Sequence, residues 1–152
     1  PNRYDNMNAY KLAGHQHVCE VERELSLAGG EKVTIMFTSH VVPVCRGIMS
    51  TLYATLRRPL TEADLLAIYR KFYQKDVFVR VFESTAPLGS MYVRGTNYCN
   101  LVVSVDSRVN KIRIVSYIDN LVKGQAGSAL QNMNLLFGFP ENMGLDRPGI
   151  YP

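Results

Sequence analysis

The pattern of apolar and polar positions predicts helices and strands in the order α, β, β, α, β, β, β, α. Helical spacing occurs in three segments, 18–28, 61–75 and 118–139. Strand-like patterns occur in five: 32–42, 48–56, 77–82, 101–105 and 111–117. The last two strands flank a turn and predict an antiparallel hairpin. These connections predict an α+β fold, in which a mostly antiparallel or mixed sheet carries helices on one face.

The segment 118–139, IDNLVKGQAGSALQNMNLLFGF, is the most informative stretch of the chain. Asp119 and Asn120 follow a predicted strand and offer capping oxygens to the helix. Gly124 and Gly127 lie early in that helix, where each glycine costs about 1 kcal/mol relative to alanine. This cost predicts a close approach to the helix backbone. Either a neighbouring helix or strand, or a ligand held at the helix start, meets this requirement.

Length and composition place the chain among soluble globular proteins. Its 152 residues fit a single domain, and 47% of them are hydrophobic while 20% are charged. The sequence has no apolar run near the ~20 residues that a membrane helix needs, and its start has no signal-peptide core, so we expect a cytoplasmic protein. The net charge is +4, but the basic residues are spread out, so no nucleic-acid partner is predicted.

Cysteines and histidines are the residues that could carry chemistry. Cys19, Cys45 and Cys99 are odd in number and lack metal-ligand spacing, so they predict buried thiols rather than disulfides or a metal site. His15 and His17 lie at the entry of the first predicted helix. Capping or surface structure is the ordinary role of such a pair. Proton transfer is the alternative, because the unperturbed histidine pKa of about 6.5 suits it.

Four segments together resemble one enzyme family, the N-acetyl-gamma-glutamyl-phosphate reductases of arginine biosynthesis. They are GHQHVCEVERELS, FTSHVVPVCRGIMSTLY, VRGTNYCNLVVSVD and IDNLVKGQAGSALQNMNLLFGFPE, in the order that the family has them. The ending GLDRPGIYP is similar too, so the resemblance covers essentially the whole chain. It implies a fold like the C-terminal domain of glyceraldehyde-3-phosphate dehydrogenase. Residues 1–117 would then be the substrate-binding and dimerisation portion, 118–139 a terminal helix that packs on a nucleotide domain, and 140–152 a tail.

The resemblance also implies a reaction, the NADPH-dependent conversion of N-acetyl-L-glutamyl 5-phosphate to N-acetyl-L-glutamate 5-semialdehyde and phosphate. In the family a cysteine thiolate attacks the acyl phosphate, hydride reduces the thioester, and a histidine handles the proton. His17 resembles this acid/base, with His15 in support. The resemblance further implies substrate-binding Arg46, Arg94 and Asn97, and cofactor-binding Asn120, Gly124 and Gly127.

The sequence departs from the family in several places. Cys19 and Ser39 stand where the family has proline, and Gln16 where it has arginine. None of the cysteines matches the family's nucleophile motif, and no dinucleotide-binding glycine motif follows a strand. Both features precede the matching region in the family. We therefore expect NADP(H) to be bound mainly by that missing part, and the 152-residue chain alone to be inactive.

Partners and alternatives follow from the same resemblance. We expect a homo-oligomer, either a dimer or a tetramer, that acts on a small acyl phosphate. One alternative is a stand-alone binding or dimerisation module without catalysis. A second is a related acyl-phosphate reductase for a longer or carrier-bound amino acid of a lysine or ornithine route.

Overall fold

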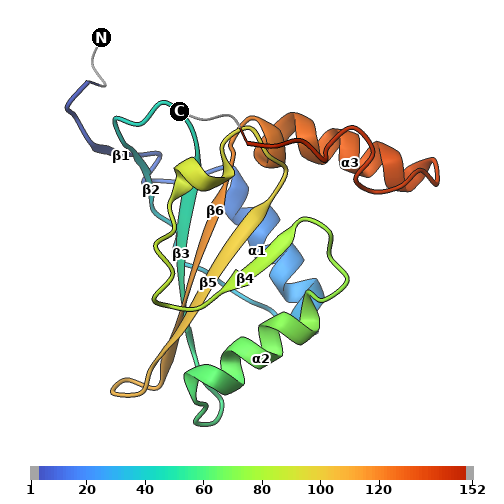
Figure 1. Cartoon of the computed structure of the whole chain (residues 1–152). Coiled ribbons are helices and arrows are strands. Elements are labelled where there is room, and N and C mark those ends of the chain that lie inside the picture. The colour runs from blue at the N-terminus through green and yellow to red at the C-terminus, as the bar shows by residue number, and fades with distance from the viewer. Residues whose placement is uncertain (1–3, 150–152) are drawn as a thin grey trace. The chain divides into compact units, whose positions relative to one another are not determined.

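The computed structural model describes residues 4–149, and these divide between Cys45 and Arg46 into two compact units (Figure 1). The N-terminal unit contains β1 (Asn8–Tyr10), α1 (His17–Gly29) and β2 (Ser39–Val41). β1 and β2 pair antiparallel, with Ala9 opposite His40. The helix ends at Gly30, which adopts a left-handed conformation with φ of 69°. The predicted first helix is therefore confirmed.

The strand predicted over 32–42 is wrong for most of its length, because only Ser39–Val41 forms a strand. The backbone N–H of Val33 donates to Ser26 Oγ at 2.9 Å, and that of Ile35 donates to Glu22 Oε1 at 3.0 Å. Side chains of α1 thus take the hydrogen bonds that a neighbouring strand would otherwise take. The short β1 was not predicted either, because its pattern is polar and its partner lies about thirty residues later in the chain.

The C-terminal unit is built on a four-stranded sheet in the order β3-β6-β5-β4. Its strands are β3 (Ile48–Thr55), β4 (Val79–Phe82), β5 (Cys99–Asp106) and β6 (Lys111–Ile118). β6 pairs antiparallel with both β3 and β5, while β4 runs parallel to β5. The sheet is therefore mixed, as predicted, and the predicted hairpin of β5 and β6 is confirmed.

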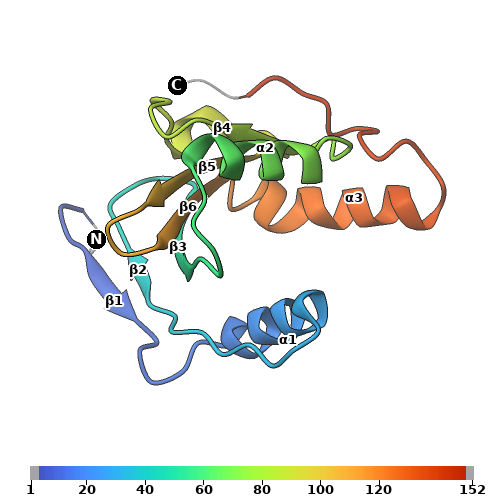
Figure 2. The same ribbon diagram turned by 90° about the horizontal axis from the view of Figure 1, so that it is seen from below.

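α2 (Glu62–Phe72) lies against β4 and β5 (Figures 1 and 2). Its first turn carries a capping box, in which the Thr61 hydroxyl accepts from Asp64 N and the Asp64 carboxylate accepts from Thr61 N, each at 3.1 Å. Leu65 is the buried residue of this helix, and Leu101 and Val103 are buried on β5. Together with Phe78, Val93 and Leu145, these side chains form the core of the unit.

The other face of the sheet is open. Cross-strand pairing places Met49 opposite Tyr117, Tyr53 opposite Arg113, and Val102 opposite Val115. All eight residues of β3 are exposed, including Met49 at 62% and Tyr53 at 66%. We call the surface formed by Met49, Tyr53, Val102, Arg113, Val115 and Tyr117 the open sheet face.

The chain leaves β6 through a π-helical turn, Val122–Ala126, which continues into α3 (Gly127–Leu136). The segment after α3 folds back along it (Figure 2). The buried Asn134 side chain holds that segment by donating to the carbonyl oxygens of Glu141 at 3.1 Å and Met143 at 2.9 Å. By contrast, the apolar side chains of Met133, Leu136 and Phe137 remain exposed.

Candidate functional site

Asp119 follows β6 directly, and its side chain is fully buried. Its Oδ2 accepts a hydrogen bond from Gly95 N at 2.6 Å and lies 2.7 Å from Arg46 Nε. Its Oδ1 accepts from Leu121 N at 2.8 Å and from Val122 N at 2.9 Å. One carboxylate thereby joins three segments that are far apart in the sequence: the entry to β3, the loop before β5 and the turn before α3.

Asp119 is held in its charged form. Burial alone would raise the pKa of its carboxyl, but the N–H groups of Gly95, Val122 and Leu121 and the Arg46 guanidinium outweigh burial and lower that pKa. The Arg46 Nε–H makes no directed hydrogen bond, although the two atoms are close. Charge attraction therefore dominates this ion pair.

Arg46 is followed by a glycine whose backbone no other residue adopts easily. Gly47 has φ of 121°, and a β-carbon there would lie 2.6 Å from the Ser90 β-carbon. Gly47 N donates to Asn120 Oδ1 at 2.8 Å. The residues after Arg46 and Asp119 are thus also joined, so two adjacent contacts fix the start of β3 against the end of β6.

The loop between Arg94 and Asn97 is the third part of this cluster. Thr96 and Asn97 are buried, and the Thr96 hydroxyl donates to Val93 O at 2.8 Å. Asn97 Nδ2 donates to Gln131 Oε1 at 2.8 Å, which connects the loop to α3. Arg94 Nε and Asn97 Oδ1 are buried without a hydrogen-bond partner among residues 4–149. Buried polar atoms of this kind require an explanation, and an unseen ligand is one.

Gly127 lies where this loop meets the helix. A β-carbon at Gly127 would be 2.3 Å from Asn97 Oδ1 and 2.7 Å from Val122 Cγ1. A β-carbon at Gly124 would be 3.3 Å from Asp119 O. The close approach that the two glycines predict therefore occurs within the chain, and Asn97 makes it at Gly127. The cofactor contacts predicted for Gly124 and Gly127 stay predictions.

The turn that carries Gly124 and leads into Gly127 is π-helical. Gly124 N donates to Asp119 O at 2.9 Å, and Ala126 N donates to Leu121 O at 3.1 Å, each across five residues. Such turns occur frequently at functional sites. Lys123, in the middle of the turn, donates to Gln131 Oε1 at 2.7 Å, the same oxygen that receives Asn97. Gln131 Oε1 therefore links the Arg94–Asn97 loop and the π-helical turn to α3.

The two histidines lie in the N-terminal unit and differ in their surroundings. His15 Nδ1 accepts from His17 N at 3.2 Å, so the neutral ring carries its proton on Nε2, 3.3 Å from the Tyr10 hydroxyl. Its ring also packs on Phe37, with centroids 5.0 Å apart. Desolvation, followed by the charges of His17 and Lys11, lowers the pKa of His15. These contacts favour the neutral form of His15.

His17 pairs with a carboxylate on its own helix. Its Nδ1 lies 2.6 Å from Glu20 Oε2, one helical turn further along α1. A carboxylate in this place holds the Nδ1 proton and leaves Nε2 as the free basic atom. About half of the His17 side chain, 54%, is exposed. His17 can therefore meet a ligand, which is what an acid/base role requires.

The cysteines are not buried thiols, and that prediction is wrong. Cys19 and Cys45 are exposed, and Cys99 is half-buried. Cys19 lies in the first turn of α1, where its thiol donates to Gln16 O at 3.2 Å, and α1 has no buried residue. Burial raises the pKa of the Cys99 thiol, which makes it a poor nucleophile. Among residues 4–149, no group of three or more metal-ligating side chains occurs.

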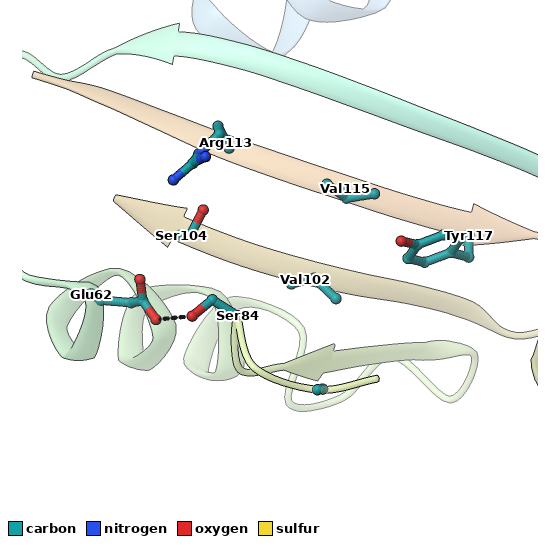
Figure 3. A pocket seen from close by; sticks show the side chains of 8 residues that line it. Glu62, Ser84, Val102, Ser104, Arg113, Val115 and Tyr117 are labelled. Atoms are coloured by element: carbon teal, nitrogen blue, oxygen red, sulfur yellow. Dashed lines mark hydrogen bonds between the residues drawn. The ribbon is translucent and has the colours of Figure 1, made fainter. Parts of the chain in front are cut away.

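A separate hollow of about 340 Å³ lies on the open sheet face (Figure 3). Its lining includes Arg113, Ser104 and Tyr117 from the sheet, and Glu62 and Ser84 from outside it. Ser84 donates a hydrogen bond to Glu62. None of the residues predicted for substrate or cofactor lines this hollow. The hollow is a feature of the sheet face and is separate from the residues around Asp119.

The structure groups the predicted residues in two sets. Six of them, Arg46, Arg94, Asn97, Asn120, Gly124 and Gly127, lie in the C-terminal unit around Asp119 and Gln131. His15 and His17 lie in the N-terminal unit. The sequence analysis missed three connecting side chains, Asp119 beyond its capping role, Gln131 and Glu20. Only Glu20 has a local signal, its spacing of three residues from His17 on a helix.

Comparison with known families decides the relationship. The family model described as "Semialdehyde dehydrogenase, dimerisation domain" matches residues 1–120. The chain belongs to the semialdehyde dehydrogenase dimerisation-domain family. The matched range includes both histidines, the Arg94 loop and Asp119.

Curated relatives of this family member are N-acetyl-gamma-glutamyl-phosphate reductases. Those from Geotalea daltonii and Geobacter metallireducens are each 47% identical over 149 residues, which is 97% of this chain. The reductase from Desulforamulus reducens is 47% identical over 148 residues. The resemblance read from the sequence is therefore confirmed. The chain spans 43% of the length of each of these relatives.

Solved structures confirm the fold class of this dimerisation-domain member. Aspartate semialdehyde dehydrogenase II from Vibrio cholerae matches 88% of this chain and 42% of its own, with a TM-score of 0.68 at 17% identity. The enzyme from Francisella tularensis matches 87% of this chain and 39% of its own, with a TM-score of 0.67 at 18% identity. Within the described part of the chain, no helix is both long and apolar enough to cross a membrane.

Proposed function

We propose that this chain is the C-terminal, substrate-binding and dimerisation part of an NADPH-dependent reductase. The complete protein would convert N-acetyl-L-glutamyl 5-phosphate to N-acetyl-L-glutamate 5-semialdehyde and phosphate in the cytoplasm. The 47% identity to reductases of this name supports the substrate class. The observation that carries the proposal is the convergence of Arg46 and the Arg94–Asn97 loop on one buried carboxylate.

The arginines suit a phosphate dianion. A guanidinium presents donors in a planar fork that matches phosphate geometry. Arg46 uses only its Nε toward Asp119, and its side chain is 25% exposed. Arg94 is half-buried, with its Nε unpaired among the described residues. Arg46 and Arg94 would bind the phosphate, and Asn97 would support the substrate pocket through its contacts with Gln131 and Gly127.

His17 would move the proton. The attacking thiolate belongs to a cysteine outside this chain, and phosphate leaves as the thioester forms. Hydride addition to the thioester then gives a tetrahedral oxyanion, which collapses to the aldehyde as the carbon–sulfur bond breaks, and a proton neutralises the departing thiolate. His17 Nε2 is the free atom that would donate this proton, while Glu20 holds the ring in place at Nδ1. His15, packed on Phe37, would support the orientation of this segment.

A nicotinamide cofactor would supply the hydride when it is bound by the complete protein. The residues present fit its approach to the turn before α3. Asn120 uses Oδ1 for Gly47 N, so its NH₂ group is left as a donor toward a carboxamide. Gly124 is exposed and presents backbone without a side chain. Gly127 is buried against Asn97, so it would affect cofactor binding only through its contact with Asn97.

Two surfaces would be covered in the complete protein. The open sheet face would meet the same face of a second copy, since an exposed β3 and a hollow beside Arg113 offer apolar and charged contacts together. The exposed Met133 and Leu136 of α3, and Phe137 directly after it, would pack on the nucleotide domain. The first of these assignments agrees with the family description as a dimerisation domain.

The test is an NADPH oxidation assay on the gene product that carries this sequence, purified at its natural length. Turnover with N-acetylglutamyl phosphate is expected, and the 152-residue chain alone should show none. Competition with a longer and a carrier-bound acyl phosphate identifies the substrate. If the natural-length protein has no nucleotide domain and shows no turnover, the proposal is overturned and the chain is a binding module.

A further inference from the structure

The Asp119 carboxylate has a geometry beyond the needs of a helix cap. A cap uses one oxygen, and Oδ1 already serves Leu121 N and Val122 N. Oδ2 is directed to other segments, 2.6 Å from Gly95 N and 2.7 Å from Arg46 Nε. The side chain is fully buried. A buried charge is costly unless it is paired, so these contacts have to persist for the site to keep its form.

The Arg46 contact leaves a functional group available. The closest contact of Oδ2 with Arg46 is at Nε, and the two terminal nitrogens of the guanidinium make no hydrogen bond with Asp119. No other acceptor for Arg46 is recorded within residues 4–149. A bidentate contact with Asp119 would have consumed one side of the guanidinium fork. The observed contact fixes the guanidinium near its base and leaves its terminal donors for an anion.

The same oxygen also holds the backbone of the Arg94 loop. Gly95 N donates to Oδ2, and Arg94 is the residue directly before it. Gly95 adopts φ of 75°, a left-handed conformation, so the chain turns at this residue and the turn sets the direction of the loop backbone. Asp119 therefore restrains both arginines. It contacts the side chain of Arg46 directly, and it holds Arg94 through the backbone of the next residue, Gly95.

We propose that Asp119 is a positioning residue that places Arg46 and the Arg94 loop for the phosphate of the substrate. This inference rests on the proposed function and deepens it, because it names the residue that assembles the phosphate site. A purely structural role for Asp119 would affect folding and all kinetic constants together. A positioning role affects the constants for phosphate and leaves those for the other substrates near the wild-type values.

The experiment uses the gene product at its natural length and the reverse reaction, in which inorganic phosphate is a substrate. Asp119→Asn keeps the shape of the side chain and removes its charge. Loss of a charged contact corresponds to about a 10- to 100-fold rise in KM for phosphate, with KM for the semialdehyde within about threefold of wild type. Asp106→Asn is the matched control, since Asp106 pairs with Arg108 at 2.7 Å in the hairpin turn. The control should leave both constants unchanged.

A double-mutant cycle tests whether Asp119 acts through Arg46. On an Arg46→Gln background, Asp119→Asn should raise KM for phosphate by a smaller factor than it does on the wild-type background, because one of the two arginines that it positions is gone. An undiminished effect on this background, or an unchanged KM in the single variant, overturns the inference. If Asp119→Asn does not fold, Arg46→Lys replaces it. A single ammonium cannot pair with Asp119 and also hold phosphate at two points, so an unchanged KM for phosphate there also overturns the inference.

Phosphate binding without turnover separates the two proposals. Titration of inorganic phosphate, followed by ³¹P NMR, should show at least about tenfold weaker binding to Asp119→Asn than to wild type. Such weakening without reductase turnover would contradict the proposed function and support the positioning role. Turnover with equal phosphate binding in both proteins would support the proposed function and contradict the positioning role. Wild-type protein that binds no phosphate would overturn the inference.

Discussion

The Asn97 side-chain oxygen faces the backbone of Gly127 so closely that a β-carbon at residue 127 would lie 2.3 Å from it. The Asn97 amide nitrogen is fixed at the same time, because it donates to Gln131 Oε1 at 2.8 Å. Asn97 is fully buried and cannot swing away. The glycine at residue 127 is therefore required by a side chain thirty positions earlier, and not by the helix to which it belongs.

Gly127→Ala should destabilise the C-terminal unit. Alanine in a helix interior is normally better than glycine by about 1 kcal/mol, whereas forced overlap in a packed site costs typically about 1–3 kcal/mol. The overlap involves Asn97 Oδ1 at 2.3 Å and Val122 O at 2.7 Å, so it should win. Urea unfolding measures the difference. Gly29→Ala, at an α1 position with no atom within 4 Å, is the control and should be neutral or stabilising; equal effects at both glycines would contradict this account.

The stability of the C-terminal unit should fall when Asp119 is protonated. An unfolded aspartate has a pKa of about 3.9, and the folded pKa of Asp119 is lower. The stabilisation is thus complete above about pH 4 and is lost as pH falls through the folded pKa. Unfolding free energies between pH 2 and 7 should show a shallower loss in Asp119→Asn.

Asp106, which is half-buried and pairs with an exposed arginine, provides the contrast for this pH dependence. Its pKa is also lowered, chiefly by the hydrogen bond from Arg108, but Arg108 is 84% exposed. Salt should therefore suppress the contribution of Asp106 and leave that of the buried Asp119 largely intact. A contribution of Asp119 that disappears in 1 M salt would show that its pairing is no different from a surface pair.

The sequence predicted those parts of the fold that depend on neighbouring residues. The α2 helix begins after Thr61 with the capping box that its residues allow, and β5 and β6 form the expected hairpin. These features depend on spacing, turn residues and local hydrogen bonds. The strand predicted over 32–42 was wrong for most of its length, because strand formation depends on the hydrogen-bond partner of the backbone. Here side chains of α1 accept those backbone hydrogen bonds.

The candidate site could be predicted as a set of residues but not as an assembly. Family resemblance named Arg46, Arg94 and Asn97, yet nothing local indicates that Asp119 joins the first two. That contact spans 73 positions from Arg46 to Asp119 and exists only once β3 and β6 are paired. Glu20 is different, since helical spacing brings it to His17 within one turn.

His17 should be the histidine on which turnover depends. In the gene product at its natural length, His17→Gln should lower kcat by about 10²–10⁴-fold, the usual contribution of a general acid or base. Glu20→Gln should lower kcat less, by about tenfold, because it removes only the charge that holds Nδ1. Steady-state NADPH oxidation measures both. His40→Gln, an exposed position on β2, is the control, and a loss there equal to that of His17→Gln would contradict the assignment.

The open sheet face should decide the oligomeric state. Met49 is 62% exposed on β3 and lies opposite Tyr117, so Met49→Asp would place a charge in the centre of the proposed contact between two copies. Burial of an unpaired charge costs several kcal/mol, so the dimer should dissociate at micromolar concentration. Analytical ultracentrifugation measures the shift from dimer to monomer. Val109→Asp, 56% exposed in the β5–β6 turn, is the matched control and should remain a dimer. If Met49→Asp stays dimeric while Val109→Asp dissociates, the contact lies at the hairpin end of the sheet and not on its open face.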